Sequence, residues 1–190
     1  MSRFAAAVVF MGTIFIGLSI LADPAAAQLT KDQKFVKSIR DGDLRAIEVA
    51  VVNGANVDAR DSDGKPILVL SAEKGRRRVV AYLLRNRAKV NATDRASGDT
   101  ALMVAAERGD TRIVDLLLTS RADLNEIDRR GETALMKAAG TGKRRVVRML
   151  IKAGADYSLE DYTGRTAMVH ARDARRQSIV TMLTAAGADR

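Results

Sequence analysis

The stretch RGETALMKAAGTGKRRVVRMLIKAGADYSLEDY, residues 130–162, sets a pattern that the rest of the chain repeats. Glycines recur at positions 64, 98, 131 and 164, spaced 34, 33 and 33 residues apart, and a second series runs through positions 42, 75, 109 and 142. The phrase Thr-Ala-Leu-Met begins at Thr100 and at Thr133, and Thr166 begins the related Thr-Ala-Met-Val. A fixed period of this length indicates a solenoid of stacked units rather than a globule around one centre.

Each unit is predicted to form two short helices. Residues 134–139 contain small apolar residues that allow neighbouring helices to approach closely, and residues 146–151 carry larger apolar side chains at helical spacing. Arg87 and Arg121 stand where a helix-ending glycine is expected, so either they adopt a left-handed conformation or the turn differs there. A threonine that is expected to cap the helix, contributing about 1 kcal/mol, precedes three of the first helices: Thr100, Thr133 and Thr166.

These phrases, with their paired alanines, their glycines and a closing Gly-Ala-Asp, resemble the ankyrin repeat. The resemblance covers nearly all of residues 28–190 and implies an all-α solenoid of about five helix–turn–helix repeats joined by β-hairpin-like loops. The first and last units are expected to be polar on their outer faces, as caps of the stack. The repeats are expected at about residues 31–60, 61–93, 94–127, 128–160 and 161–190.

Residues 1–27 differ in kind and predict a secretory signal peptide. Arg3 supplies a positive start, residues 5–21 are apolar, and Ala25–Ala27 form a small-residue cleavage site, so we expect cleavage after Ala27. The alternative is an uncleaved N-terminal anchor that leaves the domain facing the periplasm. The chain contains no cysteine, which excludes disulfides and a lipid-modified cysteine. It is therefore similar to an exported bacterial ankyrin-repeat protein, with a periplasmic or secreted location and no stable membrane insertion after cleavage.

The formal net charge of +9 suggests a nucleic-acid partner. Export and the scarcity of aromatic residues, 4% of the chain, argue against specific nucleic-acid binding. The resemblance implies that the chain binds another protein through its hairpin tips and the exposed side of its first helices, on a concave face. We also expect a monomer. Met103 and Met136 lie in that stripe, although they could instead complete the packing between repeats. The predicted partner-binding residues are Met103, Glu107, Arg129, Arg130, Met136, Lys137, Tyr162, Val169 and His170.

A second candidate surface is a basic edge formed where the second helices begin. Positive charge there opposes the helix dipole at a cost of about 0.3–1 kcal/mol each, which suggests a site for an acidic protein or an anionic envelope polymer. The alternative is an ordinary solvated face. The predicted basic edge comprises Arg76, Arg77, Arg78, Lys143, Arg144, Arg145 and Arg148, with Arg175 and Arg176 further along.

Catalytic chemistry has little support in the sequence. Without cysteine and with one histidine, a hydrolytic site would depend on His170 alone, and ligands for zinc are lacking. Other units place Leu70, Val104 or Lys137 at the equivalent position, which suggests that His170 is an exposed helix residue. We therefore predict no enzymatic activity, no cofactor and no metal; an enzyme centred on His170 is the remaining alternative.

Overall fold

The computed structural model describes residues 24–187, and this part of the chain forms ten helices and no β-strand. The predicted signal peptide lies outside the described residues, except for its last four residues, with which α1 begins. The helices are α1 (Pro24–Asp41), α2 (Leu44–Val52), α3 (Ile67–Glu73), α4 (Arg77–Arg85), α5 (Ala101–Arg108), α6 (Thr111–Thr119), α7 (Ala134–Gly140), α8 (Arg144–Ala153), α9 (Ala167–Asp173) and α10 (Gln177–Ala186).

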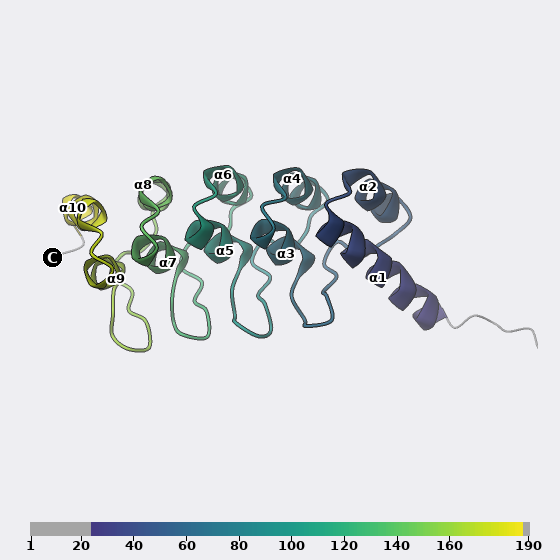
Figure 1. The fold of residues 1–190 in the computed structure, drawn as a ribbon, viewed down its shortest axis with the longest axis horizontal. Coiled ribbons are helices and arrows are strands. Elements are labelled where there is room, and N and C mark those ends of the chain that lie inside the picture. Colours follow the sequence, from purple (N-terminus) through teal and green to yellow (C-terminus); the bar gives the residue numbers. More distant parts are fainter. Residues whose placement is uncertain (1–23, 188–190) are drawn as a thin grey trace, which may run out of the picture.

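The helices stack in two rows (Figure 1). The odd-numbered helices α1 to α9 form an inner row, from which the long loops project, and the even-numbered helices α2 to α10 form an outer row on the far side from the loops. Each helix packs on its partner in the same pair and on its neighbours in the same row. This is the solenoid that the repeat period predicts. In place of full hairpins, two of the loops contain an isolated antiparallel bridge, one of them between Arg60 and Pro66.

The predicted threonine caps are confirmed. Thr100, Thr133 and Thr166 each accept a hydrogen bond from the backbone N–H three residues later, at 3.3–3.4 Å. Arg87 and Arg121 have φ values of 64° and 60°, so both adopt the left-handed conformation that glycine adopts elsewhere in the stack. An L side chain is strained in this conformation, so these two turns are held by the packing of the units around them.

The core is a continuous layer between the two rows. Alanines of α5 and α7 are at most 2% exposed, which lets the inner helices pack closely, and Val146, Val147 and Leu150 of α8 are fully buried. At the N-terminal end of the stack, Val49 and Val52 of α2 are 60% and 83% exposed. The expectation of a fully polar outer face on the first unit is therefore wrong for α2.

Adjacent units are also joined by hydrogen bonds from a backbone N–H to a side-chain oxygen, which fix the register of one unit on the next. Asn91 Oδ1 accepts a hydrogen bond from Asp123 N at 3.0 Å, and Asn125 Oδ1 accepts one from Asp156 N at 3.0 Å. One unit earlier, the acceptor is an Asp58 carboxylate oxygen. Each of these hydrogen bonds joins residues 31 or 32 positions apart. The same contact therefore recurs between successive units of the stack. None of the helices described here combines the length and apolar character that a membrane crossing needs.

Candidate functional site

An aspartate at the base of each long loop fixes that loop's shape. Asp61, Asp128 and Asp161 each accept hydrogen bonds from the backbone N–H groups two and four residues later, at 2.7–3.0 Å. In the loop between α4 and α5, which is one residue longer, Asp94 accepts a hydrogen bond from Ala96 N at 2.9 Å. Because these carboxylates are nearly buried and bonded to the backbone, the loop tips are held in place rather than left free.

Neighbouring loops are also bonded to each other. Arg129 N donates to Ser97 O at 3.0 Å, and Tyr162 N donates to Arg130 O at 3.1 Å. The Tyr162 backbone packs so closely on Gly131 that a Cβ there would lie 2.7 Å from Tyr162 N. The exposed side chains on these loops therefore form a row whose backbone is rigid, and Tyr162 is 69% exposed within it.

Lys137 is a buried structural residue, which corrects its assignment to the binding surface. Its side chain is 4% exposed, and Nζ lies 2.7 Å from Asp128, 3.0 Å from Asp99 and 3.5 Å from Glu132. Burial alone would lower the pKa of Lys137, but hydrogen bonds to Asp128 and Asp99 outweigh it and raise that pKa. Likewise, burial alone would raise the pKa of Asp128, but the Lys137 hydrogen bond and two backbone N–H groups hold it below its ordinary value. Lys137 thus ties the α7 helix to two loops.

The expected methionine stripe is absent from the surface. Met103 and Met136 are each 1% exposed, because both side chains turn back under the starts of α5 and α7. Their sulfur atoms accept the backbone N–H of Thr100 and Thr133 at 3.5 and 3.4 Å. These methionines complete the packing, the alternative that the sequence left open, so their assignment as contact residues is wrong.

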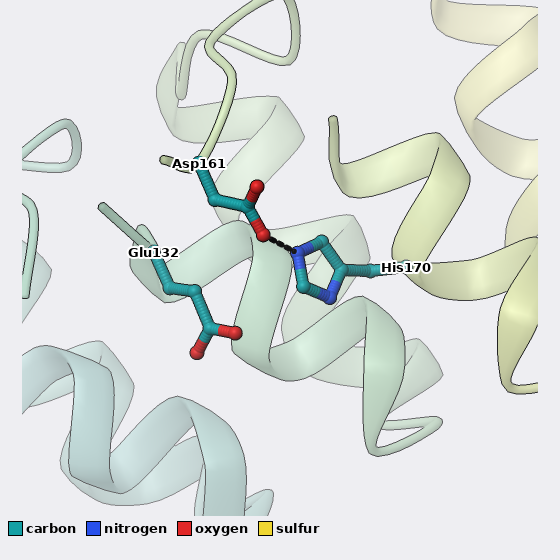
Figure 2. Close-up of side chains that lie close together, drawn as sticks. All are labelled: Glu132, Asp161 and His170. Carbon is teal, nitrogen blue, oxygen red and sulfur yellow. Dashed lines mark hydrogen bonds and ion pairs between the residues drawn. The ribbon is translucent and has the colours of Figure 1, made fainter. Parts of the chain in front are cut away.

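His170 is also largely enclosed, contrary to the expectation of an exposed helix position. Its ring is 12% exposed, and Nε2 lies 2.9 Å from Asp161 Oδ2 (Figure 2). Burial alone would raise the pKa of Asp161, but the Thr163 hydroxyl, the backbone N–H groups of Arg165 and Thr163, and His170 together hold it far below its ordinary value. One ring nitrogen of His170 is therefore engaged in holding the last loop.

Glu132, Asp161 and His170 bring one possible metal-ligand atom each to within 4.8 Å of one another (Figure 2). By type, these donors suit a divalent cation. Their charge environment does not, because Glu132 lies 2.6 Å from the Arg130 guanidinium and Asp161 lies 3.0 Å from that of Arg165. A metal ion would have to displace cations already bound to both carboxylates, so we interpret the cluster as a network of ion pairs.

The other predicted contact residues lie at or near the surface. Glu107 on α5 and Arg129, Arg130 and Tyr162 on the loops are exposed, and Val169 on α9 is half-buried. With the buried members removed, the candidate surface is concentrated on the loop tips between Arg129 and Tyr162 rather than along the inner helices.

The basic edge lies on the outer row, away from the loops. Its arginines are exposed, Lys143 is half-buried, and none of them forms an ion pair with any residue from 33 to 187. Two residues that the sequence analysis missed, Arg108 and Arg112, line the same surface. Arg112 could have been found from the period, since it lies 34 residues after Arg78 and 33 before Arg145.

The outer helices that begin with a cation of the basic edge lack the side-chain cap that stabilises α6. Asp110 caps α6 by accepting hydrogen bonds from Arg112 N and Ile113 N, both at 3.1 Å. At the same position, α4 and α8 carry Arg76 and Lys143, which provide no side-chain cap. The aliphatic part of Lys143 instead covers Gly109 of the preceding unit. The chain therefore places cations where an aspartate would stabilise the helix.

These features define a repeat solenoid that presents two polar surfaces, a rigid row of loops and a basic edge. The family model described as "Ankyrin repeats (3 copies)" matches residues 35–128 and 102–190, and the chain belongs to the ankyrin-repeat family. Ankyrin repeats are generally protein–protein interaction modules, and the family is typically non-catalytic. The comparison with curated proteins found no match to this chain.

Proposed function

We propose that this protein binds another protein through the loop surface, with Arg129, Arg130 and Tyr162 as its main contact residues and Glu107 and Val169 at its margin. The supporting observation is the rigid row of loops, because side chains on a fixed backbone lose less freedom on binding. Tyrosine and arginine are also the residue types that most often dominate binding energy at interfaces.

The test is to couple the mature chain to a resin and quantify captured envelope proteins by mass spectrometry. The double variant Arg129→Ala/Arg130→Ala and the single variant Tyr162→Ala should each reduce capture of the specific partner about tenfold or more. Arg85→Ala, an exposed arginine at the end of α4 and away from the loops, serves as the control and should retain capture. Undiminished capture by folded loop variants would contradict the proposal.

A second candidate function is electrostatic attachment through the basic edge to an acidic protein or an anionic envelope polymer. The cations of the outer row favour it, because none of them is paired with a carboxylate of residues 33–187. Binding of this kind should weaken steeply between low and physiological salt, because the interaction is between exposed charges. A packed interface on the loop surface should weaken far less, so a salt titration separates the two functions.

We further propose that the chain acts after export, in the periplasm or outside the cell, as the composition of residues 1–27 favours. Cleavage after Ala27 would leave Gln28 as the first residue and remove the first four residues of α1. Fractionation of expressing cells, followed by N-terminal sequencing, tests this. A full-length chain confined to the cytoplasm would contradict it, whereas a full-length chain in the membrane fraction would indicate the uncleaved anchor.

A further inference from the structure

A groove crosses the outer row on the side of the basic edge. It consists of three contiguous hollows, the largest with a volume of about 640 Å³. The largest hollow shares Arg77 and Arg112 with a second, and the second shares Gly109 and Thr111 with a third. The shared residues make the three hollows one feature, which runs from α4 across α6 to α8 and is open to solvent along its length.

The rim of this groove is strongly basic. Arg77 and Arg78 come from α4, Arg112 from α6, and Arg144 and Arg145 from α8. Two further cations line the groove: Arg108, at the end of α5, and Lys143, immediately before α8. Two carboxylates, Asp110 and Asp115, also line it, and Asp110 is engaged in capping α6. The groove is therefore complementary to a negatively charged occupant, and guanidinium groups bind carboxylates through paired hydrogen bonds.

The floor of the largest hollow is apolar. It is formed by Ala81 of α4, Leu116 of α6 and Met149 of α8, all half-buried and thus partly open to the groove. A polymer of charged groups alone would gain nothing from this floor. An occupant that also carries an apolar side chain would remove that floor from water, which is favourable in proportion to the area covered.

We propose that this groove binds an extended acidic segment of a partner protein, whose carboxylates pair with the arginine rim and whose apolar side chain occupies the hollow over Ala81, Leu116 and Met149. This inference rests on the second function proposed above and is independent of the loop surface. Two steps between packed helices span about 16–20 Å. An extended chain covers that length with about five or six residues, so a short linear segment is sufficient.

The experiment measures binding of fluorescent peptides of about ten residues to the mature chain by anisotropy. One peptide contains glutamates with two adjacent leucines at its centre, and its matched control has serines instead. At physiological salt the leucine peptide should bind at least about fivefold more tightly, because its apolar side chains cover the floor. Met149→Glu or Ala81→Glu, both at half-buried positions, should remove that preference.

Charge variants test the rim. Arg112→Glu should weaken binding of the leucine peptide about tenfold or more. Arg148→Glu makes the same charge change on α8 but does not line the groove, and it should weaken binding no more than about threefold. Circular dichroism establishes that each variant is folded.

Three results would overturn the proposal: equal binding of the two peptides, equal losses from Arg112→Glu and Arg148→Glu, or no peptide binding while inorganic polyphosphate binds. The last result would leave electrostatic attachment to an anionic polymer standing and remove the peptide groove alone. Failure of both peptide and polyphosphate to bind would remove the second function as well. None of these results depends on Arg129, Arg130 or Tyr162.

Discussion

The loop side and the outer edge of this solenoid differ in whether their charged side chains are buried and paired or exposed and unpaired. On the loop side, Asp128, Asp161, Lys137 and His170 are largely buried and joined by polar contacts of 2.7–2.9 Å. On the outer edge, a row of exposed arginines lacks any carboxylate partner among residues 33–187 and lies at helix starts that favour negative charge. The first group has a structural role that accounts for its charges. In the second group, Arg76 and Lys143 cover glycines of the preceding unit, but this packing does not pair their charges with carboxylates.

The difference shows that charge alone does not mark a binding residue in a repeat protein. A charged side chain on the inner helices can be buried and paired with carboxylates from the loop of its own or a neighbouring unit, as Lys137 is. At the starts of the outer helices, Arg76 and Lys143 pack over glycines of the preceding unit, but no loop carboxylate pairs with their charges. The following changes test this contrast, in order of decreasing expected effect.

The largest loss is expected from Lys137→Met. Removing the ammonium group leaves the Asp128, Asp99 and Glu132 carboxylates without their shared partner, which should lower the free energy of unfolding by about 3–5 kcal/mol. Urea denaturation followed by circular dichroism measures it. The control is Arg130→Met, whose side chain is 67% exposed, with an expected loss within about 1 kcal/mol. Equal effects of the two changes would show that Lys137 has no special structural role.

Acid should destabilise the loop side. The pKa values of Asp61, Asp128 and Asp161 are lowered in the folded chain. Their contribution to stability is therefore complete above the unfolded value of about 4 and is lost as pH falls through the folded values. The urea midpoint should hold steady from neutral pH to about pH 5 and then decline toward pH 2. Asp161→Asn should make this decline shallower. A midpoint that stays constant down to pH 2 would contradict the structural role of these carboxylates.

A smaller gain is expected when the outer edge is given the cap that α6 already has. Lys143→Asp should raise the free energy of unfolding by about 1 kcal/mol, since the new carboxylate can accept the free N–H groups of α8. The reverse change, Asp110→Ala, should lower it by about 1 kcal/mol. Thermal and urea unfolding measure both. A loss of stability in Lys143→Asp would mean that this lysine supports the fold, through its cover over Gly109.

The smallest effect concerns like charges along α8. Arg148 lies four residues from both Arg144 and Lys152, so Arg148→Glu converts two repulsions into attractions worth roughly 0.2–0.5 kcal/mol per pair. The gain should shrink in high salt, where exposed charges are screened. Arg85→Glu serves as the control, because it makes the same charge change at an exposed position on α4, away from the like charges of α8. The account of the edge would weaken if Arg148→Glu lowered stability at low salt.

Much of the fold followed from the sequence, because the period, the caps and the helix ends are local signals. Thr100, Thr133 and Thr166 could be assigned from their position before an apolar phrase. The left-handed conformation of Arg87 was one of two alternatives that its alignment with glycine left open. The loop network could not be assigned in this way. Asp99, one of the partners of Lys137, lies 38 residues away along the chain. The sequence does not show on which side of a helix the neighbouring loop packs.

The same limit explains the errors at the predicted surface. Met103 and Met136 occupy helix positions that a helical pattern can assign to either face. Their burial depends on the side chain turning back beneath the threonine cap, which only the three-dimensional arrangement shows. The arginines of the basic edge were easier to place at the surface, because the clusters at residues 76–78 and 143–145 lie two repeat periods apart and their arginines are exposed.

The central claim is that the cations of the basic edge are available to a partner because the fold does not need them. The most direct test is the free energy of unfolding of the triple variant Arg77→Gln/Arg112→Gln/Arg145→Gln, measured by urea denaturation. We predict a value equal to or higher than that of the unmodified chain, since repulsion along the edge is relieved. A loss of more than about 1 kcal/mol would contradict the claim and make these arginines part of the structure.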